Sequence, residues 1–328
     1  MSPRLRALVA VTVVALLGAA CRGGAGHPGG SPSASPEPEV AVDVADVEVQ
    51  RYDVPLGPDW MAVDEHGLWV MVDRAPSMLI DPESGDVLGT VDVGYELPLC
   101  QGIGAAYGVV YICRGTDLVR VDPETMQVVR RVPLHKEYGQ GHIAGAFDRF
   151  WVLESDGSKL TTLDPATDEV VQTFQLPARG FDLTAGPDAI WVACKVDGKV
   201  LKVDPDTGEV LLTAEVSSPE YVTADAEQVW VAGASRTYRI DPDTGEVLAT
   251  VDGGAEPIGD IASDDRYVYV RNADDQLIQI DKATGRRVAH LVSDTTTGGG
   301  VAVAGGDVWI AAVDDGTLLR LDGGALAR

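Results

Sequence analysis

An apolar run of the type Val-Trp-Val-Ala recurs seven times in this sequence, and this repeat limits the fold more than any other feature. Each run holds one aromatic residue, and consecutive aromatic residues lie 39 to 42 positions apart. They are Trp69, Tyr111, Trp151, Trp191, Trp230, Tyr269 and Trp309. An aspartate follows each of them by 11 to 13 positions, at Asp81, Asp122, Asp164, Asp204, Asp241, Asp281 and Asp322. A period near 40 residues is typical of propellers and solenoids.

Each repeat contains four short runs that have the composition of strands. In the fifth repeat they cover residues 222–224, 229–232, 237–240 and 247–251, and they are rich in Val, Ile, Thr and aromatic residues. The third and fourth runs are joined by Asp-Pro-Asp-Thr-Gly, which favours a tight turn because Pro presets φ and Gly accepts the left-handed conformation. No segment has a helical period. The sequence therefore predicts an all-β, seven-bladed β-propeller over residues 44–328.

The two ends of the repeat region complement each other. The last repeat has candidate strands near 300–303, 308–311 and 318–321 but lacks a fourth. Residues 46–54 precede the first full repeat and have no partner strand of their own. We expect this N-terminal strand to complete the last blade, which would close the ring and remove an open sheet edge.

The repeat pattern IAxxxxxVWVAxxxDGxLxRIDPxTGxVxxT resembles that of the YVTN and streptogramin-lyase-like seven-bladed propellers, over about residues 44–328. Quinoprotein blades are disfavoured because their tryptophan signature falls elsewhere. The streptogramin lyases use two histidines one residue apart, with carboxylates and a magnesium ion. The histidines of this chain are His27, His66, His135, His142 and His290. Because no two of them alternate, the resemblance implies the fold without the lyase activity.

The N-terminus has the organisation of an export signal. Arg4 and Arg6 precede an apolar stretch over 7–17, which is too short to span a bilayer. Gly18-Ala-Ala-Cys21 follows and resembles the lipobox of bacterial lipoproteins. This resemblance implies a signal peptide over 1–20 and a palmitate-type lipid on Cys21, with the protein held on the outer side of the cell membrane. The alternative is an ordinary signal peptide with an incidental cysteine.

Residues 21–43 are predicted to be the lipidated cysteine and a flexible linker, because Arg22–Val40 is rich in Gly, Pro and Ser. Export favours disulfide formation between the remaining cysteines. Cys100 and Cys113 fall on the first and second strands of one repeat, on either side of a hairpin, and we expect them to form a disulfide. The alternative is two separately buried thiols.

The composition narrows the class of partner. Apolar residues are 45% of the chain, enough for a large core, and 51 acidic residues outnumber 25 basic ones, for a net charge of −26. This charge excludes nucleic acid as a partner. The sequence contains no nucleophile elbow, zinc-protease motif or phosphate-binding glycine loop. We expect a monomer whose partner is an envelope protein or a small-molecule ligand.

The positions nine residues before each aromatic residue point to a binding site. They are Trp60, Gly102, His142, Asp182, Tyr221, Asp260 and Gly300. Each opens an innermost strand, so in a propeller they would ring one mouth of the central channel. With Gln101, the polar and aromatic members are our candidate binding residues. Asp182 and Asp260 are also weak candidates for a metal site; the alternative is that both only cap backbone amides.

These observations favour an extracytoplasmic binding or interaction module with no catalysis and no cofactor. The alternative is a lyase or hydrolase at the channel mouth. It would use His142 as the base, and Asp182 or Asp260 would orient this base or hold a divalent cation.

Overall fold

The structure is a computed structural model that describes residues 39–47, 49–54, 57–94, 100–134, 139–140, 143–154, 156–292, 297–322 and 326. The chain divides into two compact units, Met1–Glu37 and Pro38–Arg328, and all described residues belong to the second unit. In this part of the chain, no helix is long and apolar enough to cross a membrane. The only helical element in it is the 3-10 turn η1 (Val44–Asp46).

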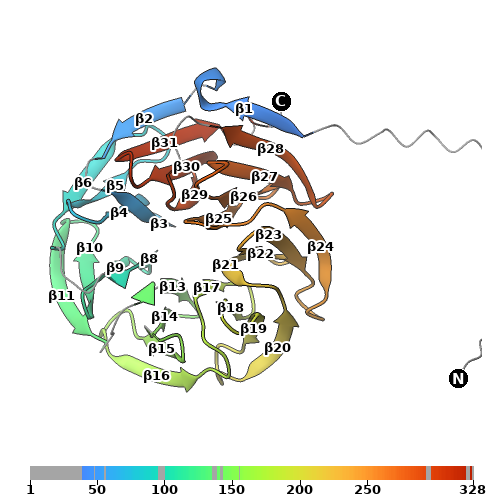
Figure 1. Cartoon of the computed structure of the whole chain (residues 1–328). Coiled ribbons are helices and arrows are strands. Elements are labelled where there is room, and N and C mark those ends of the chain that lie inside the picture. The colour runs from blue at the N-terminus through green and yellow to red at the C-terminus, as the bar shows by residue number, and fades with distance from the viewer. Residues whose placement is uncertain are drawn as a thin grey trace, which may run out of the picture. The chain divides into compact units, whose positions relative to one another are not determined.

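Seven antiparallel sheets of four strands surround a central axis (Figure 1). Blade 1 contains β3 (Pro58–Asp64), β4 (Gly67–Val72), β5 (Ser77–Ile80) and β6 (Val87–Val91). Blade 2 contains β8 (Ile103–Ala106), β9 (Val109–Arg114), β10 (Asp117–Asp122) and β11 (Gln127–Pro133). Blade 3 contains β13 (Ile143–Ala146), β14 (Arg149–Leu153), β15 (Lys159–Leu163) and β16 (Val170–Gln175). Blade 4 contains β17 (Asp182–Ala185), β18 (Ile190–Cys194), β19 (Lys199–Val203) and β20 (Val210–Glu215).

The remaining blades follow the same plan. Blade 5 contains β21 (Pro219–Ala224), β22 (Val229–Gly233), β23 (Arg236–Ile240) and β24 (Val247–Asp252). Blade 6 contains β25 (Asp260–Ser263), β26 (Tyr267–Arg271), β27 (Leu277–Asp281) and β28 (Arg286–Val292). Blade 7 contains β29 (Val301–Ala304), β30 (Asp307–Ala312), β31 (Thr317–Asp322) and β2 (Val49–Asp53). The short strands β7 (Cys100–Gln101) and β12 (Gly139–Gln140) pair in parallel outside the blades. The predicted seven-bladed propeller is confirmed.

The ring is closed by the N-terminal strand, as the sequence predicts. β2 pairs antiparallel with β31, with Val49 opposite Leu321 and Tyr52 opposite Leu318. The Tyr52 ring stacks on that of Trp309, with ring centroids 5.5 Å apart. The innermost strands β29 and β3 are also in contact, so the last blade meets the first both at the axis and through β2.

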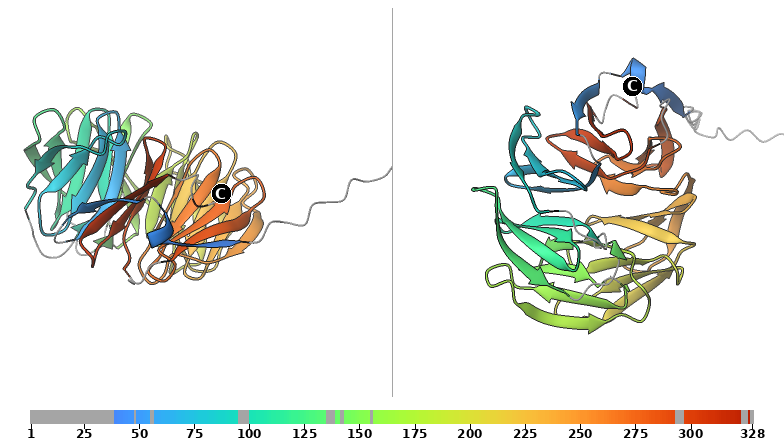
Figure 2. Two further views of the ribbon diagram at one scale, coloured as in Figure 1. Left: turned by 90° about the horizontal axis from the view of Figure 1, so that it is seen from above. Right: turned by 60° about the vertical axis from the view of Figure 1, so that its left-hand side comes forward.

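The end of the predicted linker differs from expectation. Val40–Asp43 form β1, which pairs in parallel with β28 and adds a fifth strand to blade 6. β1 and β2, in blue, lie along the outside of the orange and red strands of the last two blades (Figure 2). Glu39, just before β1, pairs with Arg287 and with His290 of β28. The alternation in Val-Ala-Val-Asp is too short to separate such a strand from a linker by sequence alone.

The seven repeated aromatic residues, which we call the aromatic column, are buried in the core of the propeller. Each of these seven residues is at most 1% exposed, in the second strand of its blade. Several of their polar atoms bond to the hairpin turn that precedes the strand: Trp151 Nε1 donates to the carbonyl of Ala146 at 3.0 Å, and Trp309 Nε1 to that of Ala304 at 3.2 Å. The Tyr111 hydroxyl instead donates to Asp168 of blade 3. The ring therefore fills the space between blades while its N–H is satisfied, which explains why an amphipathic aromatic residue recurs here.

The repeated aspartates of the first six blades cap the turns between the third and fourth strands, as the Asp-Pro-Asp-Thr-Gly pattern predicts. Asp204 Oδ1 accepts the amides of Asp206 at 2.9 Å and Thr207 at 2.7 Å. Asp241 accepts the amides of Asp243 and Thr244 in the same way. In an antiparallel four-stranded blade the first and third connections lie at one end, and we call this end of the propeller the turn face. The opposite end, where the innermost strands begin, is the mouth face.

Candidate functional site at the central channel

The innermost strands enclose a cavity of about 240 Å³ on the axis. Its lining comprises Trp60, Met61, Ala62, Gly102, Ile103, Gly104, Ala105, Ile143, Gly145, Asp182, Leu183, Thr184, Val222, Asp260, Ile261 and Val301. Three of the six candidate binding residues, Trp60, Asp182 and Asp260, thus line one cavity although they come from blades 1, 4 and 6. The inner strands that carry them face the centre of the ring in Figure 1.

A fourth candidate, Tyr221, meets Trp60 across the axis. Their ring centroids lie 5.8 Å apart at an interplanar angle of 47°. Trp60 begins the inner part of blade 1 and Tyr221 that of blade 5, so the two blades are not neighbours in the ring. Phe181 packs edge-on against Tyr221, with centroids 5.6 Å apart. The aromatic pair therefore spans the channel, and both rings belong to one buried apolar cluster.

Asp182 and Asp260 also join neighbouring blades. Asp182 Oδ2 accepts the amide of Val222, on the inner strand of blade 5, at 2.8 Å. Asp260 Oδ2 accepts the amide of Val301, on the inner strand of blade 7, at 3.0 Å, and its Oδ1 accepts the amide of Ile261. The two acids thus cap backbone amides, as in the alternative interpretation, and line the cavity at the same time.

Negative charge is concentrated around the Tyr221 hydroxyl. Burial raises its pKa well above the usual range, and the charges of Asp260, Glu220 and Asp182 raise it further. Glu220 itself is buried, and its carboxylate lies 2.8 Å from the Lys195 ammonium. Burial raises the pKa of Glu220.

Lys195 forms a bridge on the mouth face. Its ammonium lies between Glu220 and Glu256, which is 3.0 Å away, and 5.3 Å from the centre of the Phe181 ring. The hydrogen bond from Lys195 lowers the pKa of Glu256. This positive charge is thus already shared between two carboxylates and one aromatic ring outside the cavity lining.

Several candidates fall outside what the structure describes. His142, the base of the enzymatic alternative, and Cys21 lie outside the described residues, as do the side chains of Gln101 and Cys100. Cys113 is buried in β9, and its amide donates to the carbonyl of Gly102 at 2.9 Å, two residues after Cys100. The Cys100–Cys113 disulfide remains a prediction.

The metal prediction for Asp182 and Asp260 stays a prediction. One group of three side chains could hold an ion there, Asp64, Glu65 and His66, and it belongs to a hairpin turn on the turn face. It is built from consecutive residues, and Asp64 already accepts from His66 and Trp69. Asp182 and Asp260 do not belong to such a group among these residues.

Cys194 is the free cysteine of the described part of the chain. It is fully buried at the end of β18, and burial together with the charge of Asp197 raises its pKa to about 12. Its thiol therefore stays protonated and is no nucleophile at neutral pH.

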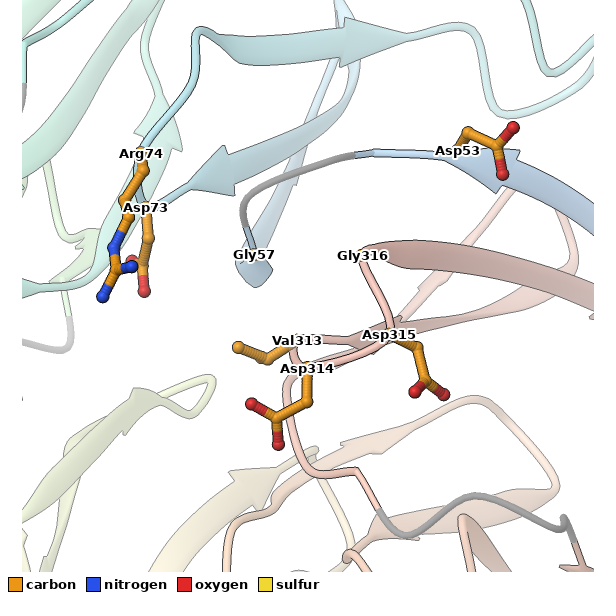
Figure 3. A pocket seen from close by; sticks show the side chains of 8 residues that line it. All are labelled: Asp53, Gly57, Asp73, Arg74, Val313, Asp314, Asp315 and Gly316. Carbon is orange, nitrogen blue, oxygen red and sulfur yellow. The ribbon is translucent and has the colours of Figure 1, made fainter.

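A second, larger cavity of about 610 Å³ lies where blade 7 meets blade 1, and sequence reasoning missed it. It is lined by Asp53, Gly57, Asp73, Arg74, Val313, Asp314, Asp315 and Gly316 (Figure 3). These residues lie at the end of β2 and in the loops that follow β4 and β30. Their proximity depends on ring closure. The acidic pair 314–315 in the loop of the last repeat was the available signal, but such pairs are common on solvated loops.

Comparisons with known proteins agree on a propeller. The family described as outer membrane protein assembly factor BamB matches residues 78–237 and 233–326 through its profile of PQQ-type repeats. The sequence argument that disfavoured quinoprotein-type blades from their tryptophan placement was therefore wrong. The more specific YVTN and streptogramin-lyase resemblance finds no support here beyond the propeller fold. No curated protein matches the sequence.

Solved structures extend the agreement at the level of fold. The crystal structure of the computationally designed Ika8 protein superposes with a TM-score of 0.62 at 12% identity, over 87% of this chain and 99% of that one. Because 1481 chains of solved structures match, this likeness shows the fold and carries no information on function. The family match, in contrast, covers residues 78–326, which is most of the chain and includes blades 2 to 6 in full. The chain therefore belongs to the family described as outer membrane protein assembly factor BamB.

Proposed function

We propose that this protein is an extracytoplasmic, lipid-anchored interaction module that helps to assemble proteins of the cell envelope. The observation that carries the proposal is the family match over residues 78–326, since the family is described as an assembly factor. A closed ring of small blades also suits this role, because it offers a rigid surface built from many loops.

The proposed anchor is supported by the N-terminal sequence, where Cys21 follows a short apolar stretch. β1 holds Val40 at the outer edge of blade 6. If Cys21 carries the lipid, the 17 residues 22–38 separate it from Glu39. Such a segment reaches at most about 60 Å when fully extended. The propeller would therefore work within this distance of the membrane.

The mouth face offers the better docking surface. Val196 and Ile258 are 80% and 53% exposed, and they stand next to Lys195 and Glu256, which form an ion pair. Exposed apolar side chains beside a paired charge are typical of transient protein interfaces, where an apolar centre is surrounded by a polar rim.

Site-specific crosslinking tests the interaction. A photoreactive phenylalanine analogue replaces Val196 or Ile258 in the full chain, in membranes of the native host. The matched control is Leu88, which is 55% exposed on the outer strand of blade 1. We expect a discrete crosslinked species with an envelope protein at both mouth-face positions and none at Leu88. Equal crosslinking at all three positions, or none at any, would contradict the proposal.

The anchor is tested separately. Wild type should partition into the detergent phase and carry a lipid mass on Cys21, whereas Cys21→Ser should remain unprocessed or move to the aqueous phase. Identical partitioning of the two forms would show that Cys21 is not lipidated.

Export also leads us to propose the Cys100–Cys113 disulfide. The position of Cys113 opposite Gly102 in the hairpin supports the pairing. Mass spectrometry of the non-reduced, digested protein should find the two peptides linked. Reduction should then cost roughly 2–3 kcal/mol of stability, since the closed loop is short. Two unlinked peptides would leave Cys100 and Cys113 as separate thiols.

A further inference from the structure

We infer that the outer edge of β28 is a docking site for an extended segment of another protein, in which an acidic residue precedes alternating apolar residues. β1 occupies this edge in cis, and the incoming segment displaces it (Figure 2). The site lies on the rim of blade 6 rather than on the mouth face, and it does not depend on the lipid anchor. Three observations point to it: a departure of blade 6 from the repeat, the ion pairs at this edge, and the limited burial of β1.

Blade 6 departs from the blades before it at two positions of its fourth strand. At the register shift between the third and fourth strands, the fourth strand has Val87, Val128, Val170, Val210 and Val247 in blades 1 to 5 but Arg287 in blade 6. Three residues later, blades 1 to 5 have Thr90, Arg131, Thr173, Thr213 and Thr250, and blade 6 has His290. Among these six blades, only blade 6 carries basic side chains at both positions.

Both basic side chains contact the acid that precedes β1. The Glu39 carboxylate pairs with the Arg287 guanidinium and lies 2.6 Å from His290 Nδ1. The Arg287 guanidinium also lies 3.4 Å from the carboxylate of Asp275, so it is placed between two acids. Charge-assisted contacts of this kind are among the stronger polar interactions in proteins. The two departures from the repeat therefore recognise one carboxylate, at the edge where a strand docks.

β1 shows which kind of segment this edge accepts. Val40–Asp43 pairs in parallel with Ala289–Val292, and Val42 packs against the buried cluster that contains Leu291. When a strand is added to a sheet edge, main-chain hydrogen bonds give affinity and side-chain contacts give specificity. Here the specificity comes from the acid at the start of the segment and from the apolar residue that faces the cluster.

β1 is held less firmly than β2, the other strand that comes from outside the repeats. It has four residues, three of them exposed, and it pairs in parallel. β2 pairs antiparallel over five residues, and its Tyr52 ring stacks on that of Trp309. Parallel pairing is slightly less stable per residue, and edge segments with few buried apolar contacts open at a fraction of the global unfolding free energy. β1 can therefore leave the edge while the ring stays closed.

Disulfide trapping on the full chain tests the site, because it measures occupancy even where a short peptide binds weakly. Val292 lies opposite Asp43 at the end of β1 and is 39% exposed. The protein carries Val292→Cys, and the probe in a redox buffer is the peptide Glu-Val-Ala-Val-Cys. In the register of β1 the two thiols lie on neighbouring strands, within reach of a disulfide.

The matched control peptide, Lys-Val-Ala-Val-Cys, differs only in the charge of its first residue. We expect the Glu peptide to be captured about fivefold or more above the Lys peptide, because attraction to the two basic side chains is replaced by repulsion. Mass spectrometry of the digested protein locates the captured peptide. A thermal melt shows that each variant is folded.

Three variants separate the parts of the site. Arg287→Val with His290→Thr gives β28 the residues of blades 1, 3, 4 and 5, and should bring the capture ratio of the two peptides to about one. Gln175→Cys places the cysteine at the equivalent position of β16, beside valine and threonine, and should show no preference either. Replacing residues 39–43 by Gly and Ser should raise capture of the Glu peptide at Val292→Cys by about tenfold, because the competing strand in cis is gone.

Equal capture of the two peptides at Val292→Cys would show that this edge does not recognise the acid, and would overturn the inference. Capture that does not rise when residues 39–43 are replaced would overturn it too, because the peptide would then not occupy the place of β1. The same preference for the Glu peptide at Gln175→Cys would mean that Arg287 and His290 do not define the site.

Discussion

The turn face and the mouth face differ in how strictly the seven blades repeat. On the turn face, aspartates at equivalent positions of successive blades accept amides of their own turns, as at Asp81, Asp122 and Asp164. At the mouth face, the equivalent positions hold an aromatic ring at Trp60, a carboxylate at Asp260, or no side chain at Gly102. The turn face thus uses an aspartate cap repeatedly, whereas the mouth positions hold five residue types in seven blades.

The difference separates residues that make the fold from residues available for recognition. A turn cap serves only its own blade, so every blade can use the same one. The mouth positions face a shared space on the axis, where seven identical side chains could not all fit. Trp60 and Tyr221 meet across the axis, and at Gly300 a Cβ atom would lie 2.7 Å from the carbonyl oxygen of Asp59.

Contacts between blades on the turn face also vary, but they do so in complementary pairs. A Cβ atom at Gly89 in blade 1 would lie 2.7 Å from Cγ of Met126 in blade 2. The next pair is Arg130 in blade 2 and Asp168 in blade 3, which form an ion pair at 3.4 Å. In the first pair a small residue faces a large one, and in the second a positive side chain faces a negative one. Each such contact therefore fits only its own pair of neighbouring blades.

Opening the ring should have the largest effect, because both faces depend on closure. Removal of residues 40–53 takes away β1 and β2 and exposes the edge of β31 together with the Trp309 ring that Tyr52 covers. We expect the melting temperature, measured by circular dichroism, to fall by about 10 °C or more. Replacing residues 40–43 alone by Gly and Ser is the control. It removes only the fifth strand of blade 6 and should cost much less. Equal melts for the two variants would show that β2 is not needed for closure.

Replacing Asp182 at the mouth face should have the second largest effect on stability. Asp182→Ala leaves the buried amide of Val222 without its charged acceptor and should cost about 2 kcal/mol. Asp182→Asn keeps an acceptor oxygen and should cost less. Urea denaturation of both variants measures the difference. If Asp182→Ala were as stable as wild type, the carboxylate would have no role in joining blades 4 and 5.

A pair substitution tests the complementary contact between blades 1 and 2. Gly89→Leu places a side chain where Met126 already lies and should destabilise by about 1–3 kcal/mol. Adding Met126→Gly should restore most of that stability, because it vacates the space and suits the positive φ of 55° at this position. Strict additivity of the two substitutions in a double-mutant cycle would mean that they do not interact.

The fold could be predicted from the sequence because the same strand and turn pattern occurs seven times. Trp191 and Asp204 show the same spacing as their equivalents, so strand order, turns and closure all follow from one pattern. β1 could not be predicted, since Val40–Asp43 is a strand only where the edge of β28 is available.

The site could be predicted only in part. Counting positions back from the aromatic column brought Trp60, Asp182 and Asp260 to one cavity. The contact of Trp60 with Tyr221 was not foreseeable, because it depends on the width of the channel and on side-chain rotamers. The partners of the two acids were likewise unpredictable, since a carboxylate can reach an amide of the next blade only after the ring has closed.

The smallest expected effect concerns a single turn cap. The amides of Thr244 and Asp243 lower the pKa of Asp241, so its carboxylate is favoured in the folded state. Its contribution is complete above the unfolded pKa of about 3.9 and is lost as the pH falls through the lower folded value. Asp241→Asn should therefore lower the melting temperature slightly at neutral pH, and the gap to wild type should close as the pH falls below about 4. Asp204→Asn, with the same cap in the neighbouring blade, should behave alike. Melts of the three proteins between neutral pH and about pH 2.5 measure both gaps. A gap that stays constant with pH, or that differs strongly between the two blades, would mean that the turn face does not repeat one solution after all.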